Sequence, residues 1–156
     1  MNQTQASKGN GAAAADRTTA VIVVTHGESG REMLATAEKL VGRLPAVRAV
    51  RVETGEPPGE VERRIDAAVT EIGGTEVLFL VDLFGSTPAR LCCKTCGGHS
   101  TVVTGVNLAM LFKLATVDRH HSPSELAAEL AATGTKSIQV IDPPPPAPPN
   151  PDPDSA

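Results

Sequence analysis

The sequence predicts a doubly wound α/β fold, in which a mainly parallel sheet carries helices on both faces. Apolar, β-branched runs alternate with segments of helical periodicity along most of the chain, and this alternation is typical of βαβ units. The run EVLFLVD at 76–82 is apolar between its two terminal carboxylates, as expected for a strand buried on both faces of a parallel sheet. We therefore expect a flavodoxin-like order, 2-1-3-4, for the first four strands.

The predicted strands are short apolar or β-branched runs bounded by turn residues. They lie at 18–25, 46–52, 76–82, 100–104 and 137–141. The last of them is expected to form a short C-terminal edge strand.

Helices are predicted where apolar residues recur every three or four positions. They lie at 28–44, 56–72, about 88–97, 106–117 and 122–134. Two prolines suit the start of the second helix, and Gly73-Gly74 suits its end. Ser122 or Ser124 is a candidate N-cap for the last helix, and Gly134 is a candidate stop.

The predicted domain covers residues 18–141 and lies between two tails. The chain has 156 residues, a length typical of one domain. Residues 1–17 are polar and alanine-rich, so they offer little to bury. Residues 142–156 hold eight of the thirteen prolines, and such a segment favours an extended conformation over a core. We expect both tails to be disordered.

Composition excludes several classes of function. Aromatic residues make up only 2% of the chain and the net charge is −4, so neither base stacking nor a basic surface supports nucleic-acid binding. No apolar run approaches the roughly 20 residues that cross a bilayer, and no signal peptide is recognisable. Three clustered cysteines do not make a disulfide framework. The expected location is therefore the cytoplasm, without direct membrane insertion.

Two candidate site residues follow the first and third predicted strands. His26 ends the first run, and Asp82 ends the third. Ligands of open α/β sheets bind beyond the carboxyl ends of the strands, where the strand order reverses, so we expect these side chains to be neighbours. A carboxylate that accepts from one ring nitrogen fixes the histidine tautomer and leaves the other nitrogen free as nucleophile or base.

The surroundings of this pair suit an anion. Gly27 and Gly30 would allow close backbone approach at the start of the first helix. Ser86 and Thr87 bring hydroxyls to the start of the third helix. Two helix N-termini that face one pocket favour phosphate. The pattern therefore indicates phosphate chemistry centred on His26.

Three segments carry a family resemblance. They are VIVVTHGESGREMLATAEKLVG, VLFLVDLFGSTPARL and VTGVNLAMLFKL. Together they resemble the IIA component of the mannose family of the bacterial phosphoenolpyruvate-dependent sugar phosphotransferase system (PTS EIIA). The resemblance extends over roughly residues 20–141 and implies a flavodoxin-like homodimer that exchanges its last strand.

The resemblance implies a phosphocarrier, a PTS component with a phosphohistidine intermediate. His26 would accept a phosphoryl group from the carrier protein HPr and pass it to a histidine of a IIB component, in sugar uptake or its regulation. Asp82 would orient His26, while Thr87 and Ser86 would contact the phosphoryl oxygens beside Gly27. No cofactor is expected, and transfer between two histidines requires no metal.

The chain departs from the family pattern near the predicted phosphate loop. Gly85-Ser86 replaces the common Gly-Gly, Ala89-Arg90 replaces Phe-Asn after the proline, and Ala109 replaces a proline. Arg90 could add a phosphate contact, but we interpret it as a solvated helix residue.

Other readings use the same residues differently. A regulatory module of this fold could sense phosphorylation state, and the dihydroxyacetone kinase phosphotransfer subunit also has a histidine after its first strand. A response-regulator receiver would need an acidic pair there, and a histidine phosphatase would need an arginine at residue 25, which is Thr25.

Thiol or metal chemistry is another alternative. The segment CCKTCGGH contains Cys93, Cys96 and His99, but a zinc site needs a fourth ligand. We interpret the cysteines as compact, buried residues of the helix. His120 and His121 are interpreted as solvated loop residues.

Overall fold

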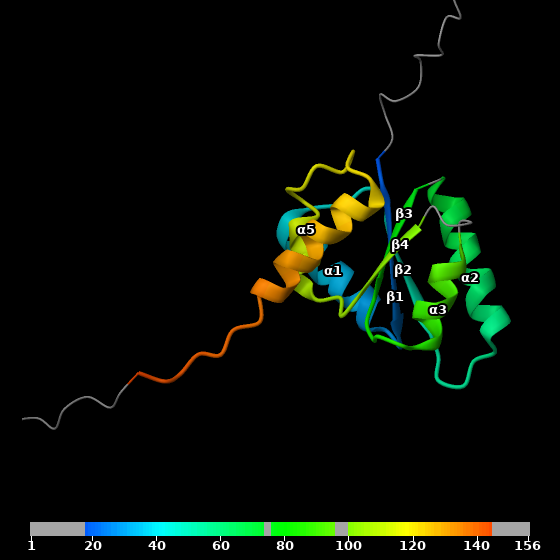
Figure 1. The fold of residues 1–156 in the computed structure, drawn as a ribbon, viewed down its shortest axis with the longest axis horizontal. Coiled ribbons are helices and arrows are strands. Elements are labelled where there is room, and N and C mark those ends of the chain that lie inside the picture. Colours follow the sequence, from blue (N-terminus) through cyan, green and yellow to red (C-terminus); the bar gives the residue numbers. More distant parts are fainter. Residues whose placement is uncertain (1–17, 74–75, 96–99, 145–156) are drawn as a thin grey trace, which may run out of the picture.

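The computed structural model describes residues 18–73, 76–95 and 100–144, and it confirms the doubly wound α/β fold (Figure 1). Its described strands form one parallel sheet in the order β2-β1-β3-β4, which is the predicted order. The strands are β1 (Ala20–His26), β2 (Val47–Val52), β3 (Val77–Val81) and β4 (Ser100–Thr104).

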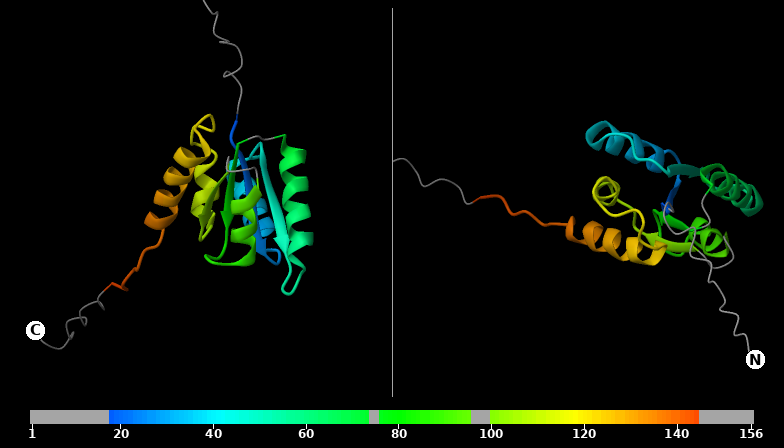
Figure 2. Two further views of the ribbon diagram at one scale, coloured as in Figure 1. Left: turned by 45° about the vertical axis from the view of Figure 1, so that its right-hand side comes forward. Right: turned by 90° about the horizontal axis from the view of Figure 1, so that it is seen from above.

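Helices cover both faces of the sheet, as Figures 1 and 2 show. They are α1 (Ser29–Val41), α2 (Pro58–Ile72), α3 (Thr87–Lys94), α4 (Leu108–Lys113) and α5 (Pro123–Lys136). Helices α1, α4 and α5 pack on one face, and α2 and α3 pack on the other. None of the helices in the described ranges combines the length and apolar character that a membrane crossing requires.

The two central strands, β1 and β3, are buried on both faces. In β1, Val21 and Val23 enter the core beneath α1, α4 and α5, while Ile22 and Val24 enter the core beneath α2 and α3. The residues of β3 alternate in the same way and are all buried. Strand β3 therefore confirms the prediction from EVLFLVD. Because both strands are buried on two faces, their register is fixed, and with it the positions of His26 and Asp82 at their carboxyl ends.

The predicted strand at 137–141 is wrong for the single chain. After α5 the chain leads away from the sheet (Figure 1), and it forms no strand among the described residues 137–144. Its apolar residues Ile138, Val140 and Ile141 are 76%, 92% and 88% exposed. A strand needs a hydrogen-bonded partner, and this segment does not reach one in its own chain.

Two further expectations change at α4 and α5. Helix α4 begins only after Asn107, whose side chain accepts from the N–H of Met110 at 3.3 Å. Gly134 does not end α5, which continues to Lys136. A Cβ on Gly134 would lie 2.3 Å from Met110 Cε and 2.9 Å from Asn107 Nδ2. Gly134 therefore permits close packing of α5 on α4.

The start of α5 agrees with its predicted cap. Ser122 accepts from the N–H of Glu125, and Glu125 accepts from the N–H of Ser122 at 3.0 Å. These reciprocal bonds form a capping box. The hydrogen bond from the Ser122 side chain lowers the pKa of Glu125.

Arg119, in the loop between α4 and α5, ties the starts of two strands together. Its Nη2 donates to the carbonyls of Thr19 at 2.6 Å and Ala46 at 3.4 Å, and burial lowers its pKa. Ala46 has a φ of 53°, a conformation that costs roughly 1–2 kcal/mol for a residue other than glycine. Arg119 therefore holds the entry to β2 in an unfavourable conformation.

We expect Arg119→Ala to lower the free energy of unfolding by about 2–3 kcal/mol, because buried carbonyls lose a charged donor. Urea denaturation monitored by circular dichroism measures this loss. Arg63→Ala is the control, since Arg63 is exposed on α2, and its change should stay within about 0.5 kcal/mol. Equal stability of the two variants would contradict the role of Arg119.

Candidate functional site

The structure brings His26 and Asp82 together at the carboxyl end of the sheet. His26 is the last residue of β1, and Asp82 follows β3 directly. The ring Nδ1 lies 3.0 Å from Asp82 Oδ2 and 3.2 Å from Oδ1, while the backbone N–H of His26 donates to Oδ2 at 2.8 Å. Asp82 thus holds both the backbone and the ring of His26.

This geometry selects the ring nitrogen that can react. An ionised carboxylate only accepts hydrogen bonds, so the neutral ring carries its proton on Nδ1 and donates it to Asp82. Nε2 then keeps its lone pair. The His26 side chain is 40% exposed, which allows a reacting group to approach from solvent. The arrangement suits a nucleophile that is oriented by a carboxylate.

His26 lines a cleft of about 340 Å³ on the α2/α3 side of the sheet. The β2–α2 loop at 53–56 forms part of its wall, and Pro58 contributes the start of α2. Thr87 and Pro88 contribute the start of α3. The cleft therefore combines a histidine with two helix N-termini, whose positive dipole ends favour an anion.

The predicted phosphate contacts lie around this cleft in different roles. Thr87 lines it directly. Ser86 is the N-cap of α3, and its hydroxyl oxygen accepts from the N–H of Ala89 at 3.4 Å. Gly27 has a φ of 59° and donates its N–H to Val52 O at 2.9 Å. Apart from its chain neighbours, no residue lies within 4 Å of where a Gly27 side chain would begin, and Gly27 lines a different cavity from the His26 cleft.

Gly30 differs from the expectation that it lets backbone approach an anion. Its N–H donates to the buried Thr25 Oγ1 at 2.8 Å, and a Cβ there would lie 2.6 Å from the same oxygen. Gly30 therefore serves the packing of α1 on β1.

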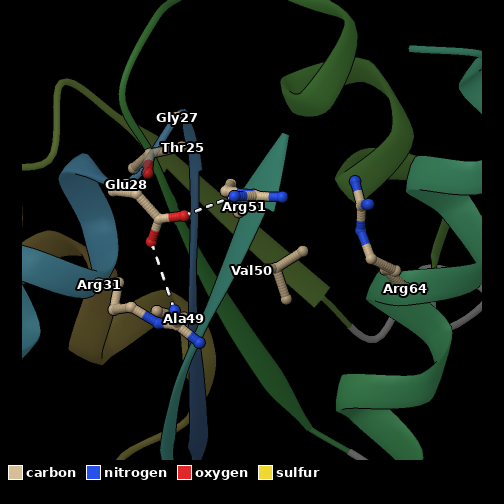
Figure 3. A pocket seen from close by; sticks show the side chains of 8 residues that line it. All are labelled: Thr25, Gly27, Glu28, Arg31, Ala49, Val50, Arg51 and Arg64. Carbon is tan, nitrogen blue, oxygen red and sulfur yellow. Dashed lines mark hydrogen bonds and ion pairs between the residues drawn. The ribbon is translucent and has the colours of Figure 1, made fainter. Parts of the chain in front are cut away.

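The start of α1 also faces another cavity, of about 280 Å³, beside the outer strand β2 (Figure 3). This cavity is lined by Glu28 and Arg31 of the α1 side, Arg51 of β2 and Arg64 of α2. In these two cavities the N-termini of the first and third helices do not meet, which differs from the prediction. The starts of the second and third helices line the His26 cleft together, because β2 lies beside β1 and the loop after β2 lines the same cleft as His26.

Sequence reasoning missed the two glutamates of this loop. Glu53 and Glu56 line the cleft. Arg51 Nε lies 3.0 Å from Glu53 Oε1, and Arg64 Nη2 lies 2.5 Å from Glu56 Oε2. The hydrogen bond from Arg64 lowers the pKa of Glu56. The glutamates could have been identified from their position in the loop after the second strand, because that strand is the predicted neighbour of the first.

Arg51 also reaches the loop after His26. Its Nη1 lies 2.7 Å from Glu28 Oε1, and Arg31 Nη1 lies 3.5 Å from Glu28 Oε2 (Figure 3). The hydrogen bond to Glu28 raises the pKa of Arg51. These pairs join the turn after β1 to the end of β2.

The cysteines agree only in part with the buried interpretation. Cys92 is fully buried, and burial raises its pKa to about 12, so it stays a thiol. Cys93 is exposed. Cys96 and His99 lie outside the described residues. Within the ranges that the structure describes, no group of three or more His, Cys, Asp or Glu could hold a metal ion.

The two loop histidines differ from each other. His120 is exposed, as expected. His121 is not a simple solvated residue, because its ring nitrogens lie 3.8 Å from carboxylate oxygens of Asp118 and Glu129. Its side chain is 42% exposed. Packing of the loop against α5 accounts for the difference.

A comparison with known protein families identifies the family of this chain. Residues 20–131 match the EIIA-man family model, which is described as the PTS system fructose IIA component. The chain therefore belongs to the mannose/fructose type of PTS EIIA components, as the resemblance of its three motifs implied.

Two relatives of the chain are also PTS components. The chain is 30% identical over 143 residues to the mannose-specific EIIAB component of Escherichia coli K12, covering 89% of this chain and 44% of that protein. It thus spans less than half of that relative's length. It is 28% identical to the fructose-specific EIIA component of Bacillus subtilis, over 77% of this chain and 84% of that protein.

Solved structures of similar proteins share the fold. The mannose/sorbose-specific IIA subunit from Enterococcus faecalis superimposes with a TM-score of 0.74 at 28% identity, covering 83% of this chain and 99% of that one. A PTS IIA protein associated with the fucose utilization operon of Streptococcus pneumoniae gives a TM-score of 0.67 at 26% identity, covering 81% and 95%.

Proposed function

We propose that the protein is a phosphocarrier in which His26 accepts a phosphoryl group from phospho-HPr and passes it to a histidine of a IIB component. The carrying observation is the contact of 3.0 Å between His26 Nδ1 and Asp82 Oδ2, which leaves Nε2 as the free nitrogen of a half-exposed ring beside a cleft. Family membership supports the phosphotransfer role. The protein would work in sugar uptake or its regulation, in the cytoplasm where its partners act.

The reaction requires little covalent chemistry from the protein. The lone pair of Nε2 attacks phosphorus in line with the donor's N–P bond, which breaks and leaves its electron pair on the donor nitrogen. The proton on Nδ1 stays in place, and Asp82 offsets the positive charge that the ring gains. Transfer to IIB reverses these bond changes.

Hydroxyls and helix N-termini would stabilise the phosphoryl oxygens. Thr87 lines the cleft beside His26, and a hydroxyl can donate one hydrogen bond while it accepts others. Ser86 is adjacent and keeps its donor hydrogen while it caps α3. Gly27 has a φ of 59° in the turn directly after His26.

Labelling from phosphoenolpyruvate tests this function. The protein is mixed with radiolabelled phosphoenolpyruvate, enzyme I and HPr, and the stability of the labelled bond is measured in acid and in base. We expect label that depends on HPr and that is labile in acid but stable in base. A folded protein that takes no label from its cognate phospho-HPr would contradict the proposal.

We also propose that the protein forms a homodimer by exchanging residues 137–141. Strand β4 has a free edge, since it pairs only with β3 in the described chain. The unpaired segment carries exposed Ile138 and Val140 in alternation, the pattern of a strand with one face to bury. A second copy would supply the partner strand that each chain lacks.

Sedimentation of two single-substitution variants tests the proposed strand exchange. Val140→Asp should shift the wild-type dimer toward the monomer, because a charge would enter the buried face. Gln139→Asp should leave the dimer intact, since neighbouring strand residues point to opposite faces. A wild-type protein that sediments as a monomer at tens of micromolar would contradict the exchange.

A further inference from the structure

The carboxylates at the His26 cleft already have cationic partners. Glu53 pairs with Arg51 and Glu56 pairs with Arg64, while Asp82 contacts His26. Phosphorylation adds about two negative charges to such a site. Because the arginines of these pairs already neutralise the glutamates, they do not offset the negative charge of the phosphoryl group.

Arg90 is a cation close to Thr87, and it lines a neighbouring pocket rather than the His26 cleft itself. It lies in the first turn of α3, and its Nη2 donates to Thr87 Oγ1 at 3.4 Å. Thr87 in turn lines the cleft with His26. In the part of the chain that the structure describes, Arg90 takes part in no ion pair shorter than 4.0 Å. Arg90 is exposed, as the sequence indicated, and it also contacts Thr87.

We propose that Arg90 is a positioning residue for the phosphoryl group on His26, acting through the Thr87 hydroxyl. The guanidinium occupies the acceptor side of Thr87 Oγ1, so the hydroxyl hydrogen is free to point at a phosphoryl oxygen. The positive charge beside Thr87 also favours the phosphorylated state over the free one. This inference rests on the proposed phosphocarrier function and deepens it.

The equilibrium of phosphoryl transfer between phospho-HPr and this protein measures the effect. Arg90→Gln should shift that equilibrium toward phospho-HPr by about three- to fivefold, the range of an exposed charge interaction. The KM for phospho-HPr should stay unchanged, and the shift should shrink in high salt. Arg90→Lys should recover part of the shift because it keeps the charge.

A matched control and a double variant isolate the mechanism. Lys94→Gln removes the same charge from the same helix one turn further on, so its equilibrium should equal that of wild type. In a Thr87→Val background, Arg90→Gln should lose the part of its effect that acts through the hydroxyl and keep only the salt-sensitive part that comes from the charge itself.

Each other outcome overturns the inference. A raised KM with an unchanged equilibrium would make Arg90 a docking residue for HPr. Equal effects of Arg90→Gln and Lys94→Gln would show that Arg90 contributes only to the general surface charge. These results leave the phosphocarrier function intact, whereas failure of the wild-type protein to take label would overturn both proposals at once.

Discussion

His26→Ala is expected to abolish labelling by phospho-HPr, since the variant lacks the imidazole ring that Asp82 orients at the cleft. Transfer needs a lone pair that can form the new N–P bond, and neither alanine nor a neighbouring carboxylate supplies a nitrogen. The side chain of His26 is 40% exposed and lies outside the apolar core. Removing it should therefore leave the thermal unfolding temperature almost unchanged.

His120→Ala is the matched control for this prediction. His120 is also a histidine, and it is exposed in the loop after α4, far along the chain from the cleft. The variant should take label at the wild-type rate in a single-turnover assay. Acid-labile label on His26→Ala would show that another residue accepts the phosphoryl group, and would overturn the assignment of His26.

The proximity of His26 and Asp82 could be predicted from the sequence because the ends of strands are recognised from local residue patterns. The apolar runs before His26 and Asp82 are long enough to identify two buried strands, and parallel strands bring their carboxyl ends to one edge. The strand at 100–104 is also found at its predicted bounds. Local periodicity and one topological rule were sufficient for these features.

The cleft wall and the glycine contacts could not be predicted in the same way. Whether the loop at 53–56 lines the same cleft as His26 depends on packing between distant segments, as does the pairing of Glu56 with Arg64. Gly30 and Gly134 match an anion turn and a helix stop by pattern, yet each lies where two elements approach closely. Close approach is a tertiary property that no local pattern records.

The C-terminal segment shows a different limit. Its alternating apolar residues favour a strand, but strand formation requires a partner edge. In the single chain the segment leaves the sheet (Figure 2), and its apolar side chains remain exposed. The prediction of a strand at 137–141 was wrong for this state because the sequence does not specify how many chains take part.

Asp82→Asn is expected to slow phosphoryl transfer by about 10²- to 10⁴-fold, the usual range for losing a group that controls a catalytic proton. This corresponds to about 3–5 kcal/mol of barrier. Oδ2 of Asp82 lies within hydrogen-bond distance of both the backbone N–H and Nδ1 of His26, at 2.8 and 3.0 Å. An amide can accept at only one of its two heavy atoms.

Two consequences follow for the asparagine variant. If its oxygen takes the place of Oδ2, it keeps the backbone bond, and its NH₂ group takes the place of Oδ1, 3.2 Å from Nδ1. There the NH₂ group repels a proton on Nδ1 and favours the tautomer with the proton on Nε2, which removes the reacting lone pair. The negative charge that offsets the phosphorylated ring is lost in either orientation. The rate should therefore fall even at saturating phospho-HPr, and nitrogen NMR should show the proton moving from Nδ1 to Nε2.

Asp66→Asn is the control, because Asp66 is an exposed aspartate on α2 and its variant should transfer at the wild-type rate. A rate for Asp82→Asn within about twofold of wild type, with Nδ1 still protonated, would mean that Asp82 does not set the state of the ring. The hydrogen bond from the backbone N–H of His26 would then be its main contribution, and Asp82 would hold the turn after β1 rather than prepare the nucleophile.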